Sequence, residues 1–477
     1  MLSARVLQPL RIRDFRLLWT GMAISMLGDG IYFVAVAFQA YELKNDPSAL
    51  ALVGFAWTGG MVLFLIIGGV VADRQPRRRV MMAADLARMA VLLAIGLLSV
   101  TGELELWMLV ALAGLYGAGE AFFGPAFSAL IPEIVPEDLL VQANSVEHSV
   151  RPLASQVAGP ALGGALVAVV GPGTGFLIDA GTFAISFACL LAMRVVEIPA
   201  PSPTGALREI KEGFSYVRSQ TWLWATLLMA SVSLLVFYGP EEVLVPFIIK
   251  NEFGGNAADF GLVLAVMGLG SVAGSLVMGR RDLPRRPVTV MYWFWGFGTL
   301  PLCLYAVATE TWHLMPLGFV IGFAMASGMV IWTTLMQLRV PRELRGRVTS
   351  LDWFVSIGLV PLSFALTAPV SATIGIDATF IGAGAFACVL AIGLLYLVPG
   401  LAEPGIRPGL RHARRGPASS RRAPSLRERG DVVGEAGIGD GGGVHAHDFD
   451  ALGAGEPGDG ADHGQTVVSE RVDRSSA

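Results

Sequence analysis

Twelve apolar runs follow one another along the chain as far as residue 400, with short polar turns between them. Each run has about the 20 residues that a helix needs to cross the hydrocarbon core of a bilayer. The pattern therefore predicts an all-α membrane protein with twelve transmembrane helices. The predicted spans are 17–40, 50–72, 80–100, 105–131, 143–170, 174–193, 222–247, 257–279, 288–308, 314–338, 350–374 and 377–399.

The runs form two groups of six that repeat. The segment Val-Pro-Glu-Asp-Leu precedes the fifth run, and Val-Pro-Arg-Glu-Leu precedes the eleventh, about 205 residues later. Transporters built from parallel repeats bind substrate between the halves near the middle of the membrane. We predict an N-terminal six-helix bundle at 1–193, a cytoplasmic central loop at 194–221, a C-terminal six-helix bundle at 222–399 and a disordered cytoplasmic tail at 400–477, where glycine and polar residues replace the apolar pattern.

Lysine and arginine are divided unequally between the two sides of the predicted membrane. Lys44 and Lys250 lie on one side. On the other side lie five groups of four cations, at 5–16, 74–79, 194–218, 280–286 and 339–347. Cytoplasmic loops carry the excess of cations, so we predict a multi-pass protein of the inner (plasma) membrane with both termini in the cytoplasm.

The central loop contains a predicted surface helix. Leu207, Ile210, Phe214 and Val217 fall on one helical face, and the cations of the segment lie elsewhere. Such an amphipathic segment is typical of a helix that lies on the cytoplasmic membrane surface.

Composition narrows the function further. Only 15% of the residues are charged, against about 25% in a soluble domain. The three lysines are in no phosphate-binding loop and no histidine is followed by glutamate, which argues against P-loop hydrolysis and zinc proteolysis. We expect no enzyme activity, no cofactor, no metal and no nucleic-acid partner, and the proton motive force as the source of energy. Cys189, Cys303 and Cys388 lie scattered in apolar runs and form neither a disulfide framework nor a metal site.

Two carboxylates lie deep in the apolar runs and are the first candidates for function. Asp29 is about twelve residues, or roughly 18 Å, from the start of the first span, and Glu120 is at similar depth in the fourth. Neither has a cation within one helical turn. A carboxyl group that moves between apolar and aqueous surroundings binds and releases a proton. Proton coupling is one interpretation, and a structural hydrogen bond to a neighbouring helix is the other.

Two acid–base pairs lie on single helices. Asp85 and Arg88 are three residues apart, and Glu147 and Arg151 are four apart, so each pair faces one side of its helix. A structural ion pair is one interpretation of both. Alternatively, Glu147 and Arg151 take part in proton coupling, and Arg151 pairs with Glu120 or Asp29.

Four further acids have weaker signals. Glu241 and Glu242 follow a proline near the outer end of the seventh span, where they either attract cationic substrates or line an exposed mouth. Asp179 and Asp352 are predicted to lie near helix starts, where the helix dipole stabilises a carboxylate.

Two motifs resemble those of the major facilitator superfamily. The turn between the second and third spans resembles its loop signature of a glycine, an Asp-Arg and a basic cluster, at Gly69, Asp73, Arg74, Arg77 and Arg78. The fifth span resembles the antiporter motif of exporters, at Gly159, Pro160, Gly163 and Gly164. Further stretches, such as 15–19 and 340–348, resemble the bacterial drug:proton antiporter group that includes enterobactin and macrolide exporters.

This resemblance implies the major facilitator fold and a secondary exporter of amphipathic small molecules, working as a proton antiporter by alternating access. It also implies that Asp73 meets the start of the eleventh helix, at 349–352, as a conformational latch. We expect a monomer in the lipid bilayer. A siderophore or metabolite exporter is the alternative within this class, and a membrane receptor or intramembrane enzyme is the alternative outside it. Candidate aromatic linings of the substrate site are Phe33, Trp57, Phe122, Phe123, Phe237 and Trp332.

Overall fold

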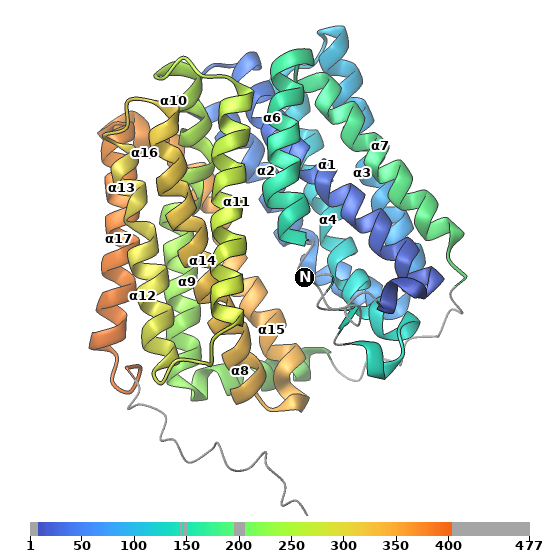
Figure 1. Ribbon diagram of the computed structural model, residues 1–477, viewed down its shortest axis with the longest axis vertical. Helices are drawn as coiled ribbons and strands as arrows, with labels where there is room; N and C mark the ends of the chain where they lie inside the picture. Colours follow the sequence, from blue (N-terminus) through green and yellow to red (C-terminus); the bar gives the residue numbers. More distant parts are fainter. Residues whose placement is uncertain (1–7, 141, 144–145, 147–150, 195–205, 403–477) are drawn as a thin grey trace, which may run out of the picture. The chain divides into compact units, whose positions relative to one another are not determined.

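The computed structural model describes residues 8–140, 142–143, 146, 151–194 and 206–402. Within these ranges the side chains at 66, 70, 72, 73, 137, 206–210 and 342 are outside the description. The regular elements of the described chain are all helical (Figure 1). The predicted tail at 400–477 lies almost entirely outside the described residues.

The N-terminal half comprises η1 (Gln8–Arg11), α1 (Arg13–Leu43), α2 (Pro47–Arg74), α3 (Arg77–Thr101), α4 (Leu106–Ile134), η2 (Glu137–Leu139), η3 (Leu153–Ala158), α6 (Gly159–Val170) and α7 (Pro172–Ala192). The C-terminal half comprises α8 (Ala206–Ser219), α9 (Thr221–Gly239), η4 (Pro240–Leu244), α10 (Val245–Asn251), α11 (Ala257–Gly279), α12 (Pro287–Thr299), α13 (Pro301–Tyr305), α14 (Thr311–Arg339), α15 (Arg342–Ile357), α16 (Val360–Ile374) and α17 (Ile376–Leu397).

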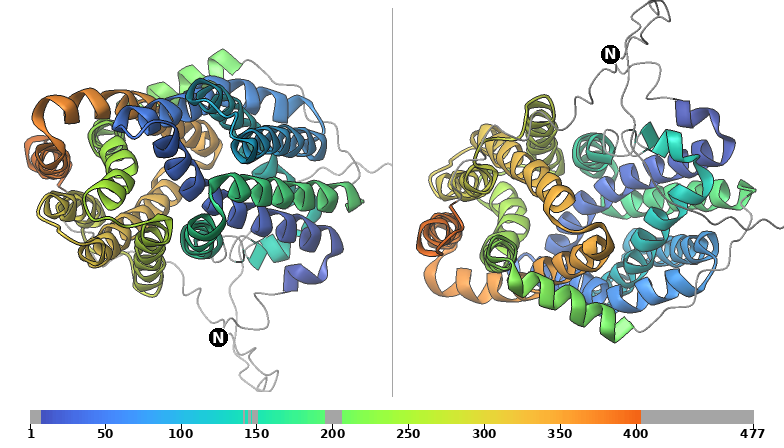
Figure 2. Two further views of the ribbon diagram at one scale, coloured as in Figure 1. Left: turned by 90° about the horizontal axis from the view of Figure 1, so that it is seen from above. Right: turned by 90° about the horizontal axis from the view of Figure 1, so that it is seen from below.

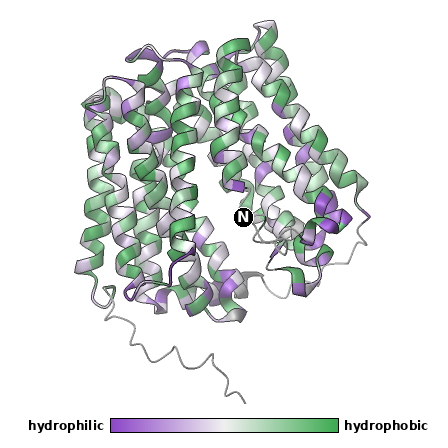
Figure 3. Ribbon diagram, in the orientation of Figure 1, coloured by the Kyte–Doolittle hydropathy of each residue, from purple (hydrophilic) through white to green (hydrophobic). Residues whose placement is uncertain are grey.

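Twelve membrane-length apolar segments are present in the described chain, as the sequence predicts. Figure 3 shows apolar residues along the lengths of the helices and polar residues gathered near their ends. Most limits agree with the predicted spans within a few residues. The eleventh helix differs, because α15 begins at Arg342 and carries its first two turns of polar residues outside the apolar run.

Two spans are interrupted by wide helical turns at prolines. The fifth passes from the π-helix η3 into α6, where Pro160 has no N–H for a helical hydrogen bond. The seventh passes from α9 through the π-helix η4, which begins at Pro240, into α10. A π-turn adds one residue per turn and frequently marks a functional position, since it redirects the side chains that follow it.

Glycines bring equivalent helix pairs together in the two halves. A Cβ built on Gly117 would lie 2.0 Å from the carbonyl oxygen of Trp57, which fixes α4 against α2. A Cβ built on Gly322 would lie 2.0 Å from the carbonyl oxygen of Met267, which fixes α14 against α11. Gly117 and Gly322 are 205 residues apart, so the packing repeats at the same spacing as the sequence. The two views of Figure 2 show these helices from their ends.

The halves meet along α6 and α11 and along α2 and α16. We call the side of the membrane on which α1 begins the N side and the other the far side. Within the described residues two hydrogen bonds join the halves, and both are on the far side. Tyr41 Oη donates to the carbonyl oxygen of Val243 at 2.5 Å, and Asn45 Nδ2 donates to Asn251 Oδ1 at 2.6 Å.

The central loop contains the predicted helix, α8, but its described part packs against α15 and not only against lipid. Gly213 lies against Leu351 and Arg347, Glu212 pairs with Arg347, and Tyr216 Oη donates to the carbonyl oxygen of Arg339. Phe214 of the predicted apolar face is exposed, whereas Val217 of the same face is buried.

Candidate functional site

Arg88 is at the centre of a group of acids in the N-terminal half. It lies on α3 with 4% of its surface exposed, and its guanidinium carbon is 4.4 Å from the ring centre of Phe183 and 4.7 Å from that of Phe123. Gly119 leaves room for the arginine stem, since a Cβ there would lie 2.9 Å from Arg88 Cγ. A guanidinium between two ring faces is stabilised by cation–π attraction in a position remote from water.

Asp85 is the ion-pair partner of Arg88, as the three-residue spacing predicts. Arg88 Nη2 donates to Asp85 Oδ1 at 2.8 Å, and Ser186 Oγ of α7 donates to Asp85 Oδ2 at 2.6 Å. Asp85 is fully buried. A buried pair of this kind is satisfied only as a unit, because either charge alone would lack compensation.

Asp29 and Glu120 each receive one hydrogen bond from an aromatic side chain of another helix. Tyr116 Oη of α4 donates to Asp29 Oδ1 at 2.6 Å, and its ring stacks on that of Tyr32 with 4.5 Å between centres. Trp57 Nε1 of α2 donates to Glu120 Oε2 at 3.1 Å. Both carboxylates remain partly exposed, so each has contact with the space between the helices.

Asp179 is a fourth acid of this group that the sequence interpretation placed wrongly. It was expected near a helix start, but α7 begins at Pro172, two turns earlier, and Asp179 is fully buried. Thr182 Oγ1 donates to Asp179 Oδ1 at 2.9 Å, while Oδ2 has no hydrogen-bond partner in the described chain. A Cβ at Gly28 would lie 2.0 Å from Asp179 Oδ1, so this glycine next to Asp29 makes room for it.

Arg88 acts electrostatically on all four acids. Its charge attracts Asp85 directly and is felt by Asp29, Glu120 and Asp179. Arg151 contributes a smaller attraction at Asp29 and Glu120. We call Asp29, Asp85, Arg88, Glu120 and Asp179 the Arg88 cluster. Glu147, the expected partner of Arg151, lies outside the described residues.

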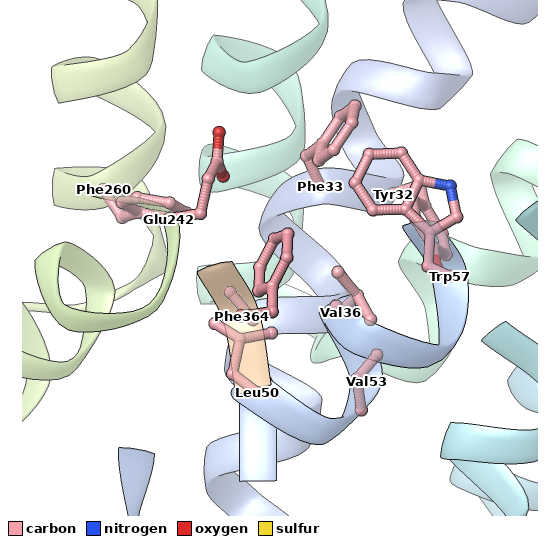
Figure 4. Close-up of a pocket in the computed structure, with 11 residues that line it drawn as sticks. Tyr32, Phe33, Val36, Leu50, Val53, Trp57, Glu242, Phe260 and Phe364 are labelled. Atoms are coloured by element: carbon pink, nitrogen blue, oxygen red, sulfur yellow. The ribbon is translucent and has the colours of Figure 1, made fainter. Parts of the chain in front are cut away.

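A small cavity lies between the halves, just below the hydrogen bonds on the far side. It encloses about 30 Å³, room for about two water molecules. Phe33 and Trp57 line it from the N-terminal half, as proposed for a substrate site, and Glu242, Phe260 and Phe364 line it from the other half (Figure 4). Phe122, Phe123, Phe237 and Trp332, which were also proposed as linings, are not among the residues of this cavity.

The glycines of the antiporter-type motif form a contact between the halves. Gly159 and Gly163 lie against α1, where a Cβ on either would meet main-chain atoms at 2.7 Å. Gly164 faces the other half, and a Cβ there would lie 2.6 Å from the carbonyl oxygen of Ala257. On α11, a Cβ at Gly261 would lie 2.3 Å from the carbonyl oxygen of Pro160.

Comparison with known proteins decides the family. The family described as transmembrane secretion effector matches residues 4–408. The chain belongs to this family of major facilitator transporters.

Similar transporters cover most of this chain. Macrolide efflux protein A of Streptococcus pyogenes is 24% identical over 79% of this chain and 94% of its own. The multidrug efflux pump Tap of Mycolicibacterium fortuitum is 28% identical over 74% and 88%. The uncharacterized MFS-type transporter YfiS of Bacillus subtilis is 27% identical over 80% and 92%.

Solved structures have the same fold at low sequence identity. A bacterial homologue of the iron transporter ferroportin in its inward-facing state has a TM-score of 0.62 and 16% identity over 81% of this chain and 98% of its own. A POT family transporter in complex with 5-aminolevulinic acid has a TM-score of 0.65 and 12% identity over 83% and 96%. The expected fold is therefore confirmed, and the chain is a multi-pass transporter of small molecules and not an enzyme.

The signature turn of this transporter is short, and its arginines act within one half. Only Gln75 and Pro76 separate α2 from α3. Arg77 pairs with Glu133 and donates to the carbonyl oxygen of Ala129 at 3.1 Å. Arg78 donates to the carbonyl oxygens of Leu190 and Leu191 at 2.7 and 2.9 Å, at the end of α7. The bond to Leu191 satisfies a carbonyl group that the end of α7 leaves open.

The remaining members of the signature have different surroundings. A Cβ at Gly69 would meet nothing within 4 Å, whereas one at Gly68 would lie 2.4 Å from the carbonyl oxygen of Ala121, so Gly68 is the close-packing glycine. Arg74 is exposed, and the side chain of Asp73 lies outside the described residues.

The expected helix start at 349–352 is wrong. Because α15 begins at Arg342, Asp352 lies inside the helix, where its carboxylate accepts from Trp332 Nε1 at 2.9 Å. Residues 349–352 therefore offer no open N–H groups to an anion. The sequence interpretation assigned the charged residues 342–347 to a loop because they precede the apolar run. The helix itself begins before that run.

Proposed function

We propose that this transporter exports amphipathic small molecules and is driven by proton antiport. The Arg88 cluster is the observation that carries the proposal. Four acids in one apolar region share one central arginine, so ionising all of them would leave uncompensated negative charge in the membrane interior. The number of protons in such a cluster changes when water reaches it.

Asp29 and Glu120 are the proton-coupling residues in this proposal. Both are partly exposed and each holds a single hydrogen bond from a neutral donor, whereas Asp85 is fully buried and bonded to Arg88 and Ser186. We assign to Asp85 the role of holding Arg88 in place. We assign to Asp29 and Glu120 the binding and release of protons. Arg151 and Glu147 are assigned to the same step.

The transport step is alternating access, in which the halves at 1–193 and 222–399 rock about the contact of α6 with α11. In this proposal both termini lie in the cytoplasm, which makes the N side cytoplasmic and makes the state with the far-side hydrogen bonds formed the one closed toward the outside. Gly69, Asp73 and Arg74 form a latch between the halves, and α15, which contacts α2, is the element they meet. The antiporter-type motif allows the close packing that this motion needs.

Energy and relatives support export. A proton that crosses 100 mV supplies about 2.3 kcal/mol, and a tenfold concentration gradient costs about 1.4 kcal/mol. One proton therefore sustains a gradient of more than tenfold. The names of the relatives from Streptococcus pyogenes and Mycolicibacterium fortuitum, a macrolide efflux protein and a multidrug efflux pump, favour drug-like substrates.

The test is uptake of a labelled macrolide into everted membrane vesicles whose interior is made acidic. Protons leaving the vesicle should drive the macrolide in, and Asp29→Asn should abolish the response to the pH gradient. Glu103→Gln is the matched control, since Glu103 is exposed in the turn before α4 and should leave uptake unchanged. Uptake by Asp29→Asn at the wild-type rate, or no uptake by the wild type, would contradict the proposal.

A further inference from the structure

A second group of acids, both partly buried, lies in the C-terminal half and has no cationic partner among the described residues. Glu241 and Glu242 belong to the π-helix η4, which carries them into the packed region after Pro240. Glu241 Oε1 is buried without a hydrogen-bond partner. Neither carboxylate has a hydrogen bond or an ion pair among the described residues.

Glu242 faces the small cavity between the halves. Figure 4 shows Glu242 together with Phe33 and Phe260 among the side chains that line this cavity. Trp57 stands edge-on to Phe33 with 5.3 Å between centres, and Phe364 closes the cavity from α16. The lining thus combines one carboxylate with five aromatic residues, Tyr32 among them, and contains no lysine or arginine among its described residues.

This combination is suited to a cation. Aromatic faces attract a positive charge, most strongly where water is excluded, and a carboxylate in the same place adds a direct charge interaction. A neutral or anionic ligand would leave Glu242 without compensation in an apolar region. A small inorganic cation would require several oxygen ligands, and no group of three potential metal ligands occurs in the described chain.

We propose that Glu242 and the rings of Phe33, Trp57, Phe260 and Phe364 form the binding site for an organic cation with apolar substituents. This deepens the exporter function proposed above and rests on it. The ligand enters when the halves part at the far side, because Phe364 now lies against Gly54, where a Cβ would be 2.2 Å from its ring. Glu241, one residue away, does not line the cavity.

The site lies where both halves contribute, which suits a transported molecule. Phe33 and Trp57 come from α1 and α2, while Glu242, Phe260 and Phe364 come from η4, α11 and α16. The hydrogen bond from Tyr41 to the carbonyl oxygen of Val243 is next to Glu242 in sequence. A ligand held by Glu242 therefore bears directly on the contact that closes the far side.

The test uses the purified full-length protein in lipid nanodiscs and two probes of similar shape. Tetraphenylphosphonium is a lipophilic cation, and triphenylphosphine oxide is its neutral counterpart. Glu242→Gln should weaken tetraphenylphosphonium binding on the order of thirtyfold, because a charge partner is lost from an apolar site. Binding of the neutral probe should be unchanged, and Glu242→Asp should restore most of the cation affinity.

Glu252→Gln is the matched control, since it removes an exposed charge just beyond α10 and should leave both affinities unchanged. The proposal is overturned if the wild-type protein does not bind tetraphenylphosphonium, if Glu242→Gln binds it like the wild type, or if both probes weaken together. If the Glu242→Gln variant lost only the response of transport to a pH gradient, Glu242 would be a proton site, and the proposal would also be overturned. Glu242-dependent binding with no uptake into everted vesicles would instead count against the exporter function.

Discussion

The acids of the two halves differ in the partners that surround them. In the N-terminal half Asp29, Asp85, Glu120 and Asp179 surround a resident arginine and receive hydrogen bonds from tyrosine, serine, tryptophan and threonine. In the C-terminal half Glu241 and Glu242 have no partner in the described chain. The protein therefore compensates one group itself and leaves the other for a positive charge from outside.

Under the proposed antiport, this difference separates two tasks, proton coupling and ligand binding. A group with its own cation can gain and lose protons without losing its structure, because hydrogen bonds hold each acid in place. A group of acids without a cation gains the most electrostatic stabilisation when a cationic ligand binds. Substitutions in the first group should act on stability and coupling, and those in the second on the choice of ligand.

The largest effect is expected from Arg88→Met. Removing one member of a buried ion pair costs about 3–5 kcal/mol, and here several acids lose their cation together. We expect a clear drop in the thermal unfolding temperature in detergent and loss of transport. Arg280→Met, at an exposed position, is the control. If Arg88→Met unfolded at the wild-type temperature, Arg88 would not be the centre of the cluster.

A second test of the same variant removes the opposing charge as well. The double variant Asp85→Asn with Arg88→Met should recover part of the lost stability, since a pair removed as a whole leaves less uncompensated charge than either half alone. It should not recover transport, because Asp29 and Glu120 still lack the arginine.

A smaller effect is expected from Tyr116→Phe. It removes the 2.6 Å hydrogen bond to Asp29 and keeps the ring that stacks on Tyr32. Hydrogen bonds to charged groups contribute about 1.5–3 kcal/mol, so transport driven by a pH gradient should fall about tenfold or more. Tetraphenylphosphonium binding should stay at the wild-type level. Equal loss of both would show that the two groups of acids do not act separately.

The smallest effect, and the opposite sign, is expected from Glu241→Gln. The substitution replaces a carboxyl group whose buried Oε1 has no partner and which lies next to Glu242, so stability should stay constant or rise by about 1 kcal/mol. The measurement is the thermal unfolding temperature in detergent. The comparison is with Asp85→Asn, which should lower that temperature. A drop of equal size in both variants would mean that Glu241 has a partner after all.

The sequence predicted the fold and the two mid-membrane acids well, because both follow from local pattern. Twelve apolar runs and a charge inside an apolar run are visible without any knowledge of packing. Asp85 and Arg88 were also paired correctly, since three residues place two side chains on one helical face.

The partners of these acids were out of reach for a physical reason. Tyr116 and Trp57 meet Asp29 and Glu120 across helices, and the rotation of each helix about its axis is set by packing that a single sequence does not display. Asp179 was misplaced because the start of its helix was taken too late. The glycine before Asp29 was an available signal, since a glycine at that depth indicates close approach of something from another helix.

The contact between α6 and α11 has a consequence for how the protein moves. Interlocked side chains make a helix contact jump between discrete arrangements, because each displacement requires the rotamers to change. Gly164 and Gly261 bring main chain against main chain at this contact and offer no side chains to interlock. We therefore expect displacement to be easier there than on the far side, where the hydrogen bonds of Tyr41 and Asn45 must break before the halves can part.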